Sequence, residues 1–434
     1  KIAAGLAYSG EAGLFTGYTE LTTTGAKVLA LYKDGAEVES AAAGDDVVVV
    51  LDKTPFYAEM GGQVGDAGTL SDDSTLLKVS DTFRIKANVF GHAAHIAEGT
   101  LKKGDTLTAS VDAERRNAIA RNHSVTHIMH KALREVLGEH VAQKGSLVND
   151  AVTRFDFHHD KPMTAEEIRQ VEDIVNAEIL ANTPVQCRVM SLADARTSGA
   201  TMLFGEKYGE MVRVLNIGTS VELCGGTHVA RTGDIGSFKI ISEAGISAGV
   251  RRVEAVTGLN AVRLMQDNAD LLATAAAKFK APAQELPEKI DHLGETVKRL
   301  EKELAEAKAK LAAKQGDEAL SAAQDINGVK VLLTTLEGID AKTLRETMDK
   351  FKSKFGSAVI VLAVTGGDKA QLCAGVTKDL IGKIKAGELV NFVAAQCGGK
   401  GGGKPDMAMA GASDVKALPA ALESARAWIA EKLA

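Results

Sequence analysis

Two short motifs, far apart in the sequence, place the strongest constraint on how this chain can fold. The first is His123-Ser-Val-Thr-His127 and the second is Cys224-Gly-Gly-Thr-His228, so each spaces its two metal-binding side chains four residues apart. On a helix, residues i and i+4 lie on one face, where two imidazoles can converge on one ion. The glycines of the second motif allow a turn tight enough to bring its Cys and His to a common point. Three nitrogens and one sulfur suit Zn²⁺, so the sequence predicts a fold that brings this helix and this turn together.

Composition and charge narrow the class of protein. A length of 434 residues predicts roughly two to four domains, and 45% hydrophobic with 25% charged residues is typical of a soluble globular protein. The formal net charge of −6 argues against a globally basic nucleic-acid binder but leaves room for a local basic patch. Four dispersed cysteines give no disulfide framework and favour a reducing compartment, which we expect to be the cytoplasm. No run approaches the roughly 20 apolar residues of a membrane span.

The spacing of apolar residues changes along the chain between patterns typical of strands and of helices, and these changes divide it into four segments. Short apolar runs broken by Gly, Asp and Thr predict a small β-barrel in the first segment. The second segment mixes strand and helix signals, the third is helical, and the fourth alternates strand and helix as an α/β domain does. We therefore expect an α+β multidomain protein, with segments at residues 1–111, 112–258, 259–324 and 325–434. Because the chain begins at Lys1 and not at Met, and shows no signal peptide, we interpret it as a fragment of something longer.

Helix signals are clearest in the second segment. Asp112 is a plausible N-cap for a helix that reaches Leu137 and is stopped by Gly138, and His130 lies beside the face that carries the two histidines of the first motif. A second helix begins after Thr164, whose capping-box partner is Glu167. The remaining apolar runs predict strands at 145–148, 153–157, 185–190, 211–216, 237–242 and 251–256.

The third segment carries a repeat of 3.5 residues. Its apolar positions alternate spacings of four and three, with Glu and Lys between them, which predicts a coiled coil or an antiparallel helical hairpin. Pro282 and Pro287 would mark the turn of a hairpin, whereas one helix of an ordinary bundle is the alternative. The repeat consists of Leu286, Ile290, Leu293, Val297, Leu300, Leu304, Ala307 and Leu311.

One alternative to a zinc site stays open at the paired motif. The histidines could be satisfied side chains of a helix, with Cys224 buried in a turn. A metalloprotease is excluded on a specific point, because Ser124 occupies the position where that chemistry needs a glutamate. Four protein ligands usually make a closed, structural zinc site, whereas a catalytic zinc keeps a position open for water. The motif therefore predicts zinc without deciding between these roles.

A glycine-rich stretch in the fourth segment is a second candidate site. Successive glycines can turn backbone N–H groups inward as an anion nest, and two lysines add charge, so a nucleic-acid backbone is a plausible ligand. The alternative is a flexible surface loop. The spacing is not that of a P-loop, because Pro405 follows Lys404. The candidate residues are Gly398, Gly399, Lys400, Gly401, Gly402, Gly403 and Lys404.

Several other polar or reactive residues carry weaker signals. Gly61-Gly62-Gln63 is interpreted as a turn rather than as a functional motif. Gln143, Lys144 and Ser146 follow the histidine helix and would line its pocket or form a polar connection. The cysteines without a partner at ligand spacing are expected to be packed thiols; they are Cys187, Cys373 and Cys397.

Longer stretches around these motifs resemble a known family. HSVTHIMHKALREVLGEHVAQKGSLV, RFDF, CGGTH and ISEAGISAGVRRVEAVTG resemble the editing domain of alanyl-tRNA synthetases, whose core is similar to that of free-standing editing proteins and of bacterial threonyl-tRNA synthetases. TPFYAEMGGQVGDAG resembles the barrel that precedes this domain, and GGKGGGKPDMAMAG resembles the family's C-terminal domain, which is also attached to DHH phosphoesterases. No Asp-His-His motif occurs in the chain, nor do the class II motifs or the ATP site of aminoacylation.

The resemblance implies roles for individual residues. It implies zinc ligation by His123, His127, Cys224 and His228, and a place for Gln143 near the editing pocket. As a hypothesis on mechanism, we take Thr126 and Gln143 as candidates for reading the serine hydroxyl, and Cys224 as a catalytic candidate as well as a ligand. Gly398–Gly403 matches the family's glycine-rich loop for the outer corner of tRNA. By the same resemblance the coiled coil and the C-terminal domain provide self-association.

The implied activity is hydrolysis of Ser-tRNA or Gly-tRNA mischarged on the alanine-specific tRNA. The chain would be the C-terminal portion of an alanine–tRNA ligase, and by itself would not activate alanine. Two other hypotheses are kept: a free-standing editing hydrolase with the same chemistry, and a tRNA-binding and oligomerisation module whose zinc is purely structural.

Overall fold

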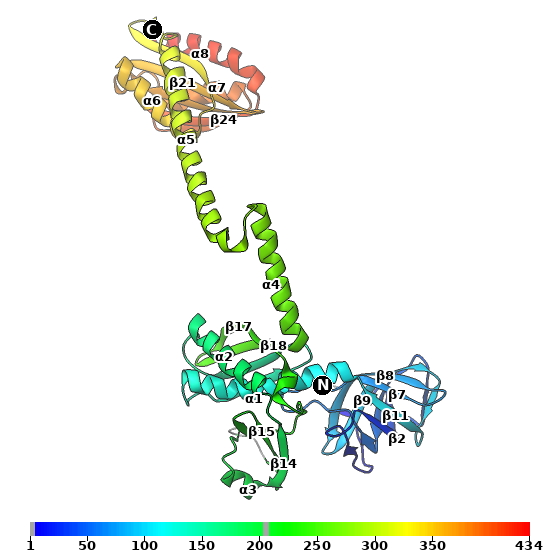
Figure 1. Ribbon diagram of the computed structural model, residues 1–434. Helices are drawn as coiled ribbons and strands as arrows, with labels where there is room; N and C mark the ends of the chain where they lie inside the picture. The colour runs from blue at the N-terminus through cyan, green and yellow to red at the C-terminus, as the bar shows by residue number, and fades with distance from the viewer. Residues whose placement is uncertain (1–4, 203–207) are drawn as a thin grey trace. The chain divides into compact units, whose positions relative to one another are not determined.

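The structure of the protein is a computed structural model that describes residues 5–202 and 208–434. The chain divides into two compact units, Lys1–Thr274 and Ala275–Ala434, and both combine helices with sheets. The expected α+β multidomain class is confirmed, with a barrel, mixed domains and one long helix (Figure 1). Among the described residues, no helix is long and apolar enough to cross a membrane.

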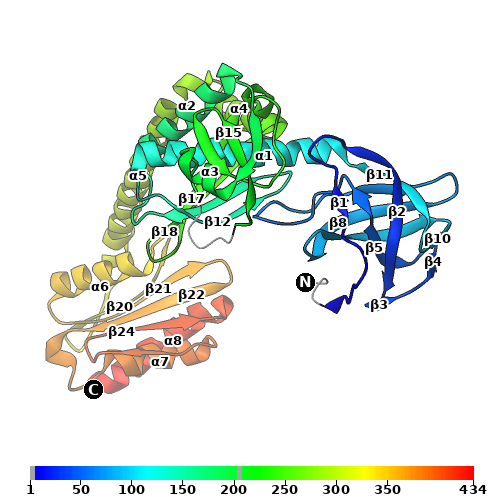
Figure 2. The ribbon, with the colours of Figure 1, turned by 90° about the horizontal axis from the view of Figure 1, so that it is seen from below.

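The first unit opens with a closed barrel of six antiparallel strands, drawn in blue in Figure 2. The strand order is β2-β5-β9-β8-β7-β11, and β11 pairs back with β2 to close the sheet. Closure leaves no free sheet edge among these strands, and their inward side chains form one aliphatic core that includes Val49, Leu70 and Leu107. The strands are β2 (Thr22–Lys33), β5 (Asp46–Leu51), β7 (Gly68–Ser71), β8 (Leu76–Lys86), β9 (Val89–Glu98) and β11 (Thr106–Val111).

Five short strands complete the barrel region. β3 extends the barrel sheet beside β2, β1 pairs in parallel with β6, and β10 pairs with β4. Their bounds are β1 (Leu14–Phe15), β3 (Ala36–Glu37), β4 (Ser40–Ala42), β6 (Lys53–Thr54) and β10 (Thr100–Lys102).

A long helix leaves the barrel and packs on a four-stranded antiparallel sheet. The helix is α1 (Ala113–Leu137); Asp112 caps it by accepting from the backbone N–H of Arg115, as predicted. The sheet order is β12-β13-β18-β17, and α2 packs beside α1 with the predicted capping box of Thr164 and Glu167. The bounds are β12 (Gln143–Val148), β13 (Thr153–His158), α2 (Ala165–Ala181), β17 (Phe238–Ser247) and β18 (Val250–Thr257).

A smaller three-stranded antiparallel sheet supplies the second motif. Its order is β14-β15-β16, and the motif begins directly after β16. The elements of this part are β14 (Gln186–Ser191), α3 (Leu192–Thr197), β15 (Met211–Ile217), β16 (Ser220–Leu223) and the 3₁₀ turn η2 (Thr232–Ile235).

The helical third segment is two helices separated at the predicted prolines. α4 (Gly258–Lys278) is followed by the 3₁₀ turn η3 (Ala283–Glu285) and by α5 (Leu286–Leu320), with Pro282 before η3 and Pro287 in the first turn of α5. Most of the predicted repeat on α5 is exposed, from 44% of Leu311 to 56% of Leu304. Within the described residues, only Leu286 among the repeat's leucines is buried.

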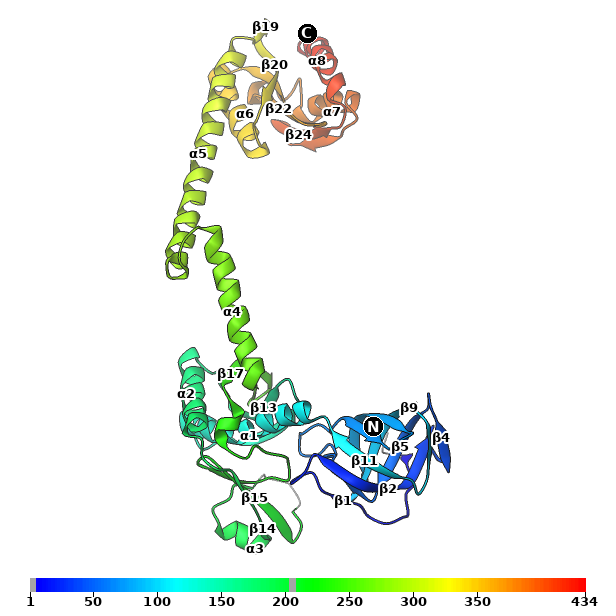
Figure 3. The same cartoon turned by 45° about the vertical axis from the view of Figure 1, so that its right-hand side comes forward.

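The second unit places helices on both faces of a six-stranded sheet (Figure 3). α5 and α6 share one apolar core with one face, whereas α7 and α8 share another core with the opposite face. The sheet order is β19-β20-β21-β22-β24-β23, in which only β20 and β21 pair in parallel. The bounds are β19 (Gln324–Ile326), β20 (Val329–Glu337), α6 (Ala341–Phe355), β21 (Ala358–Gly366), β22 (Lys369–Val376), α7 (Ala386–Gln396), β23 (Gly401–Gly403), β24 (Met407–Ala412) and α8 (Leu418–Leu433), with 3₁₀ turns η4 (Lys378–Leu380) and η5 (Val415–Ala417).

The glycine-rich stretch is not a continuous nest. Gly401–Gly403 forms the edge strand β23, which pairs with β24. The two strands lie so close that a Cβ on Gly401 would clash with the backbone oxygen of Met409, so this position requires glycine. Only Gly398 in this stretch has a positive φ, of 68°. The backbone N–H groups of Gly399 and Gly401 donate to Ala394 and Asn391 within the domain.

Candidate metal centre and its pocket

Helix α1 presents the first half of the centre. His123 and His127 lie one turn apart on its buried face, and their rings stack with centroids 5.4 Å apart. Asp112 caps the N-terminus of this helix and Gly138 ends it, so both histidines lie in its middle turns and away from its ends, where helices fray.

The loop after β16 brings the second half against α1. A Cβ added to Gly226 would lie 2.0 Å from a ring carbon of His123, so this position requires glycine. The close approach places the Cys224 sulfur 3.4 Å from Nε2 of His123 and 3.2 Å from Nε2 of His228. The four predicted ligand side chains therefore meet at one point.

The geometry of this cluster fits a bound metal ion. One ligand atom from each of His123, His127, Cys224 and His228 lies within 4.8 Å of the others. Nε2 of His127 is buried and has no hydrogen-bond partner, a state that costs free energy unless something binds the nitrogen. A nitrogen- and sulfur-rich donor set of this kind suits zinc.

Three further side chains orient the imidazoles. Nδ1 of His123 contacts Oε1 of Gln63 at 2.6 Å, Nδ1 of His127 contacts Glu222 at 3.2 Å, and Nδ1 of His228 contacts Oγ of Ser124 at 3.0 Å. Each contact occupies Nδ1 and leaves Nε2 facing the centre. Outer partners of this type fix ring orientation and tautomer in metal sites.

The electrostatics of the cluster favour an ionised thiol. Burial raises the pKa of Cys224, but the three neighbouring histidines lower it further, so the net shift is well below the ordinary value. Burial lowers the pKa of His127, yet Cys224 and Glu222 raise it to about 10. Burial raises the pKa of Glu222, and His127 outweighs this effect and brings it to about 2. The cluster thus favours the thiolate that metal ligation needs, whereas His127 would have to release its proton when a metal binds.

Two residues expected to take part in catalysis have no hydrogen bond to the four ligands among the described residues. The Thr126 hydroxyl is buried, donates to the backbone oxygen of Asn122 and contacts the Thr153 hydroxyl at 2.5 Å. Gln143 begins β12, half-buried, opposite Phe157. The cluster itself is therefore built without them.

Gln63 and Glu222 are the participants that sequence reasoning missed. Gln63 is fully buried, accepts from the Thr227 backbone N–H and donates to the Thr227 hydroxyl, so the turn does bear on the site. Glu222 lies on β16, two residues before Cys224, but nothing in the local sequence marks it as the partner of His127. Nothing local in Gly61-Gly62-Gln63 indicates its partner, which lies far along the chain.

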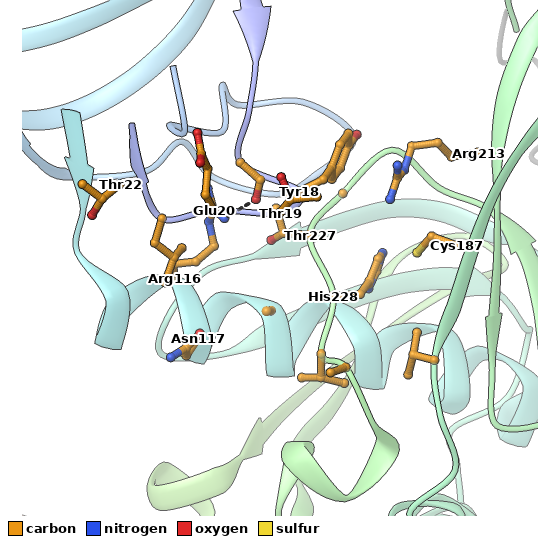
Figure 4. Close-up of a pocket in the computed structure, with 17 residues that line it drawn as sticks. Tyr18, Thr19, Glu20, Thr22, Arg116, Asn117, Cys187, Arg213, Thr227 and His228 are labelled. Atoms are coloured by element: carbon orange, nitrogen blue, oxygen red, sulfur yellow. Dashed lines mark hydrogen bonds between the residues drawn. The ribbon is translucent and has the colours of Figure 1, made fainter. Parts of the chain in front are cut away.

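A pocket of about 670 Å³ opens beside the centre (Figure 4). It lies between the β1–β2 loop, the start of α1 and the Cys224 loop. Thr227 and His228 line one part of it, and Tyr18 and Arg213 line another; we call it the Tyr18 pocket. Cys187, expected to be a packed thiol, is instead exposed and lines this pocket, whereas Cys373 and Cys397 are buried as predicted.

Comparisons with known families agree with this architecture. The model for class II (A) tRNA synthetases matches residues 6–115, that for the second additional domain of threonyl and alanyl tRNA synthetases matches residues 212–254, and that for the DHHA1 domain matches residues 328–431.

Curated relatives match the chain from end to end. Alanine–tRNA ligases of Delftia acidovorans and Methylobacillus flagellatus are 59% and 61% identical over 433 residues, which cover 100% of this chain and 49% of each relative. The crystal structure of the C-Ala domain from Aquifex aeolicus alanyl-tRNA synthetase matches 26% of this chain and 96% of that chain, at 24% identity and a TM-score of 0.24. The chain spans about half the length of the curated relatives it matches. It belongs to the alanine–tRNA ligase family, and its three matched domains fit the C-terminal portion of such an enzyme.

Proposed function

We propose that this chain is the editing and tRNA-binding part of an alanine–tRNA ligase, and that it hydrolyses Ser-tRNA and Gly-tRNA mischarged on the alanine-specific tRNA. The single observation that carries the proposal is the convergence of three imidazole Nε2 atoms and a thiol beside an open pocket. The substrate class, a mischarged aminoacyl-tRNA, follows from membership of the alanine–tRNA ligase family. Ligation of alanine with ATP is proposed for the whole enzyme and is not expected from this chain.

A separate hydrolytic site has a physical reason in such an enzyme. A small apolar amino-acid pocket cannot strongly reject a near-isostere that adds one hydroxyl, and glycine is smaller than alanine and fits any pocket that admits it. Selectivity beyond this limit requires a second site that removes the wrong product. The metal centre and the Tyr18 pocket are well suited to that task.

We propose that zinc occupies the cluster, held by His123, His127, Cys224 and His228. When bound, it supplies a Lewis acid that can orient the ester or lower the pKa of water towards ~7. The chain's own residues define that position, since Gln63, Ser124 and Glu222 hold the imidazoles. Gln143 and Thr126 remain our candidates for reading the amino-acid part of the substrate; Thr126 would first exchange its contact with Thr153.

Deacylation by the purified chain tests this function. We expect hydrolysis of Ser-tRNA(Ala) and little hydrolysis of Ala-tRNA(Ala), with loss of both hydrolysis and bound zinc in Cys224→Ala. Cys397→Ala, whose thiol is buried in the second unit, is the matched control. A Cys224→Ala protein with normal zinc content and a normal rate on Ser-tRNA would refute the proposal.

The complete four-ligand set favours a second candidate, in which the zinc is structural and the chain only binds tRNA and assembles. In that case the wild-type protein binds zinc and tRNA but leaves Ser-tRNA intact. The same assay therefore separates the two candidates.

Binding of tRNA is proposed for the glycine-rich strand of the second unit. The glycines leave this edge of the domain without side chains, so a phosphate backbone could approach closely, and Lys400 and Lys404 are exposed on either side of β23. The glycines are Gly398, Gly399, Gly401, Gly402 and Gly403. Each phosphate contact removed should lower the salt dependence of binding, the slope of log K against log salt, by about 0.7 to 0.9. We expect this change from Lys400→Ala and from Lys404→Ala, but not from Lys289→Ala on exposed α5.

A further inference from the structure

Arg213 in the Tyr18 pocket stacks on an aromatic ring but has no hydrogen-bond acceptor among the described residues. It lies on β15, and its guanidinium carbon is 3.6 Å from the centroid of the Tyr18 ring. Its Nε is buried without a hydrogen-bond partner, and no carboxylate pairs with it in the part of the chain that the structure describes. A buried donor of a charged group that lacks an acceptor costs free energy, so this arrangement favours a ligand that supplies one.

Tyr18 is held rigidly and yet remains accessible. Its hydroxyl donates to the backbone oxygen of Gly225, next to Cys224, and the ring meets Phe15 edge-on with centroids 4.8 Å apart. Even so, 42% of its surface is exposed. An ordered aromatic side chain that keeps this much exposed surface provides a stacking platform without a large cost in conformational entropy.

The pocket joins this platform to the metal centre. Its volume of about 670 Å³ falls within the roughly 300–1,000 Å³ range of small-molecule sites, and His228 belongs both to the cluster and to the pocket wall. Figure 4 shows Tyr18, Arg213 and His228 on the same opening. A substrate whose ester lies at the cluster therefore extends its next group into the Tyr18 pocket.

The two cations that line the pocket are not equivalent. Arg116 is buried and already donates to Asp66 and to the backbone oxygens of Gly17 and Pro55. Arg213 makes none of these bonds. Among the described residues, the pocket guanidinium without a hydrogen-bond acceptor is thus that of Arg213 beside Tyr18, where a planar base and an anionic phosphate can both be recognised.

We propose that Tyr18 and Arg213 bind the 3′-terminal nucleotide of the aminoacyl-tRNA, with the base stacked on the face of Tyr18 that Arg213 does not cover and Arg213 donating to the phosphate. The inference rests on the proposed function, because it assumes that the ester is presented at the metal centre. It assigns a positioning role, in which the pair holds the base and phosphate while the reacting atoms lie at the cluster. The amino-acid part of the substrate offers no planar group for such a platform.

The test uses the whole chain and a seryl analogue of adenosine 5′-monophosphate in which a 3′-amide replaces the ester, so that both the base and the phosphate are present. Loss of one base–aromatic stack predicts about tenfold weaker binding of the analogue to Tyr18→Leu, with a similar rise in KM for Ser-tRNA and little change in kcat. Tyr18→Phe keeps the ring and should bind normally, whereas Arg213→Lys should weaken binding. Tyr8→Leu is the matched control, because Tyr8 also lies under a cation, Lys86, but outside the pocket.

A second analogue without the base isolates stacking. The wild-type protein should bind the analogue without the base about as weakly as the Tyr18→Leu variant binds the full analogue. The Tyr18→Leu variant should bind the two analogues equally well. The assignment would be overturned if the wild type, Tyr18→Leu and Arg213→Lys bound the full analogue with equal affinity. This outcome requires that all three proteins keep their zinc and that the wild type still hydrolyses Ser-tRNA. Failure of the wild type to hydrolyse Ser-tRNA is a different outcome, which removes the proposed function on which the inference rests.

Discussion

Three side chains that bind no metal decide which nitrogen each imidazole turns toward the centre. Gln63 comes from the barrel region, Ser124 from α1 and Glu222 from β16, so three separate parts of the first unit meet around the four ligands. Because each partner contacts Nδ1, the Nε2 atoms converge without needing an ion to pull them together. The centre is thus pre-organised by hydrogen bonds at the scale of single residues.

Gln63→Ala should lower zinc affinity about 10- to 100-fold, because His123 loses the contact that fixes its ring. Competition with a chromophoric chelator measures the change. Gln186→Ala, on an exposed strand of the same unit, is the control and should bind zinc like the wild type. Unchanged affinity in Gln63→Ala would mean that the 2.6 Å contact does not orient the ligand.

His92 should make the first unit sensitive to acid. It is fully buried in the barrel between Val49 and Thr54, and burial lowers its pKa from 6.5 to about 4. The unfolded chain binds this proton more tightly, so the stabilisation is complete above pH 6.5 and is lost as pH falls towards 4. His92→Gln should remove about 2 kcal/mol from the stability difference between pH 7 and pH 5.

Urea unfolding at the two pH values measures this difference. The comparison of wild type with variant cancels the contribution of the metal cluster, which both proteins share. Gln186→Ala, which removes no titratable group, is the control and should leave the wild-type pH dependence in place. An unchanged difference in His92→Gln would show that His92 does not titrate in this range.

At the scale of elements, the sequence predicts helix ends that depend on neighbouring residues, but not strand pairings between distant segments. The bounds of α1 and α2 follow from Asp112, Gly138 and the Thr164–Glu167 capping box, all of which act within one turn. Closure of the barrel depends on β11 pairing with β2, which no local pattern specifies. The strand Gly401–Gly403 looked like a loop because glycine carries no strand signal; its pairing with β24 decides its structure.

The same distinction applies to the metal centre. Spacing alone predicted all four clustered ligands, because i, i+4 geometry is local. The partners Gln63 and Glu222 could be identified only from the tertiary structure. Gln63 lies 60 residues from His123 in the sequence, and Glu222 lies 95 residues from His127. Arg213 and Tyr18 have no local pattern at all.

Helix α5 should associate with a second copy of the chain through its exposed stripe. Burying a heptad repeat of this length against a partner is the usual way to remove such apolar surface from water. Leu293→Glu with Leu300→Glu should convert an associating protein into a monomer in sedimentation experiments. Lys302→Glu lies on the opposite face of α5, changes the net charge by the same amount, and should leave association intact. A wild-type protein that is monomeric at every concentration would contradict this prediction.

At the scale of the whole molecule, the metal centre belongs to one unit only. All four ligands lie before Thr274, and the second unit has its own two apolar cores. The five tyrosines also lie in the first unit, whereas the single tryptophan, Trp428, lies on α8 of the second. The two units therefore carry separate spectroscopic reporters, and unfolding of the chain need not be a single two-state transition.

Removal of metal should therefore destabilise only the first unit. A ligand present at 100 times its Kd stabilises the state that binds it by about 2.7 kcal/mol, so a chelator should lower the temperature of the tyrosine-reported transition and leave the Trp428-reported transition in place. Cys224→Ala should lower the same transition and make it insensitive to chelator. Leu372→Ala, in the core of the second unit, should do the reverse, shifting the Trp428 signal while the tyrosine signal keeps its response to metal. Equal shifts of both signals on chelation would instead show that the two units unfold together, and that zinc stabilises the chain beyond the unit that holds it.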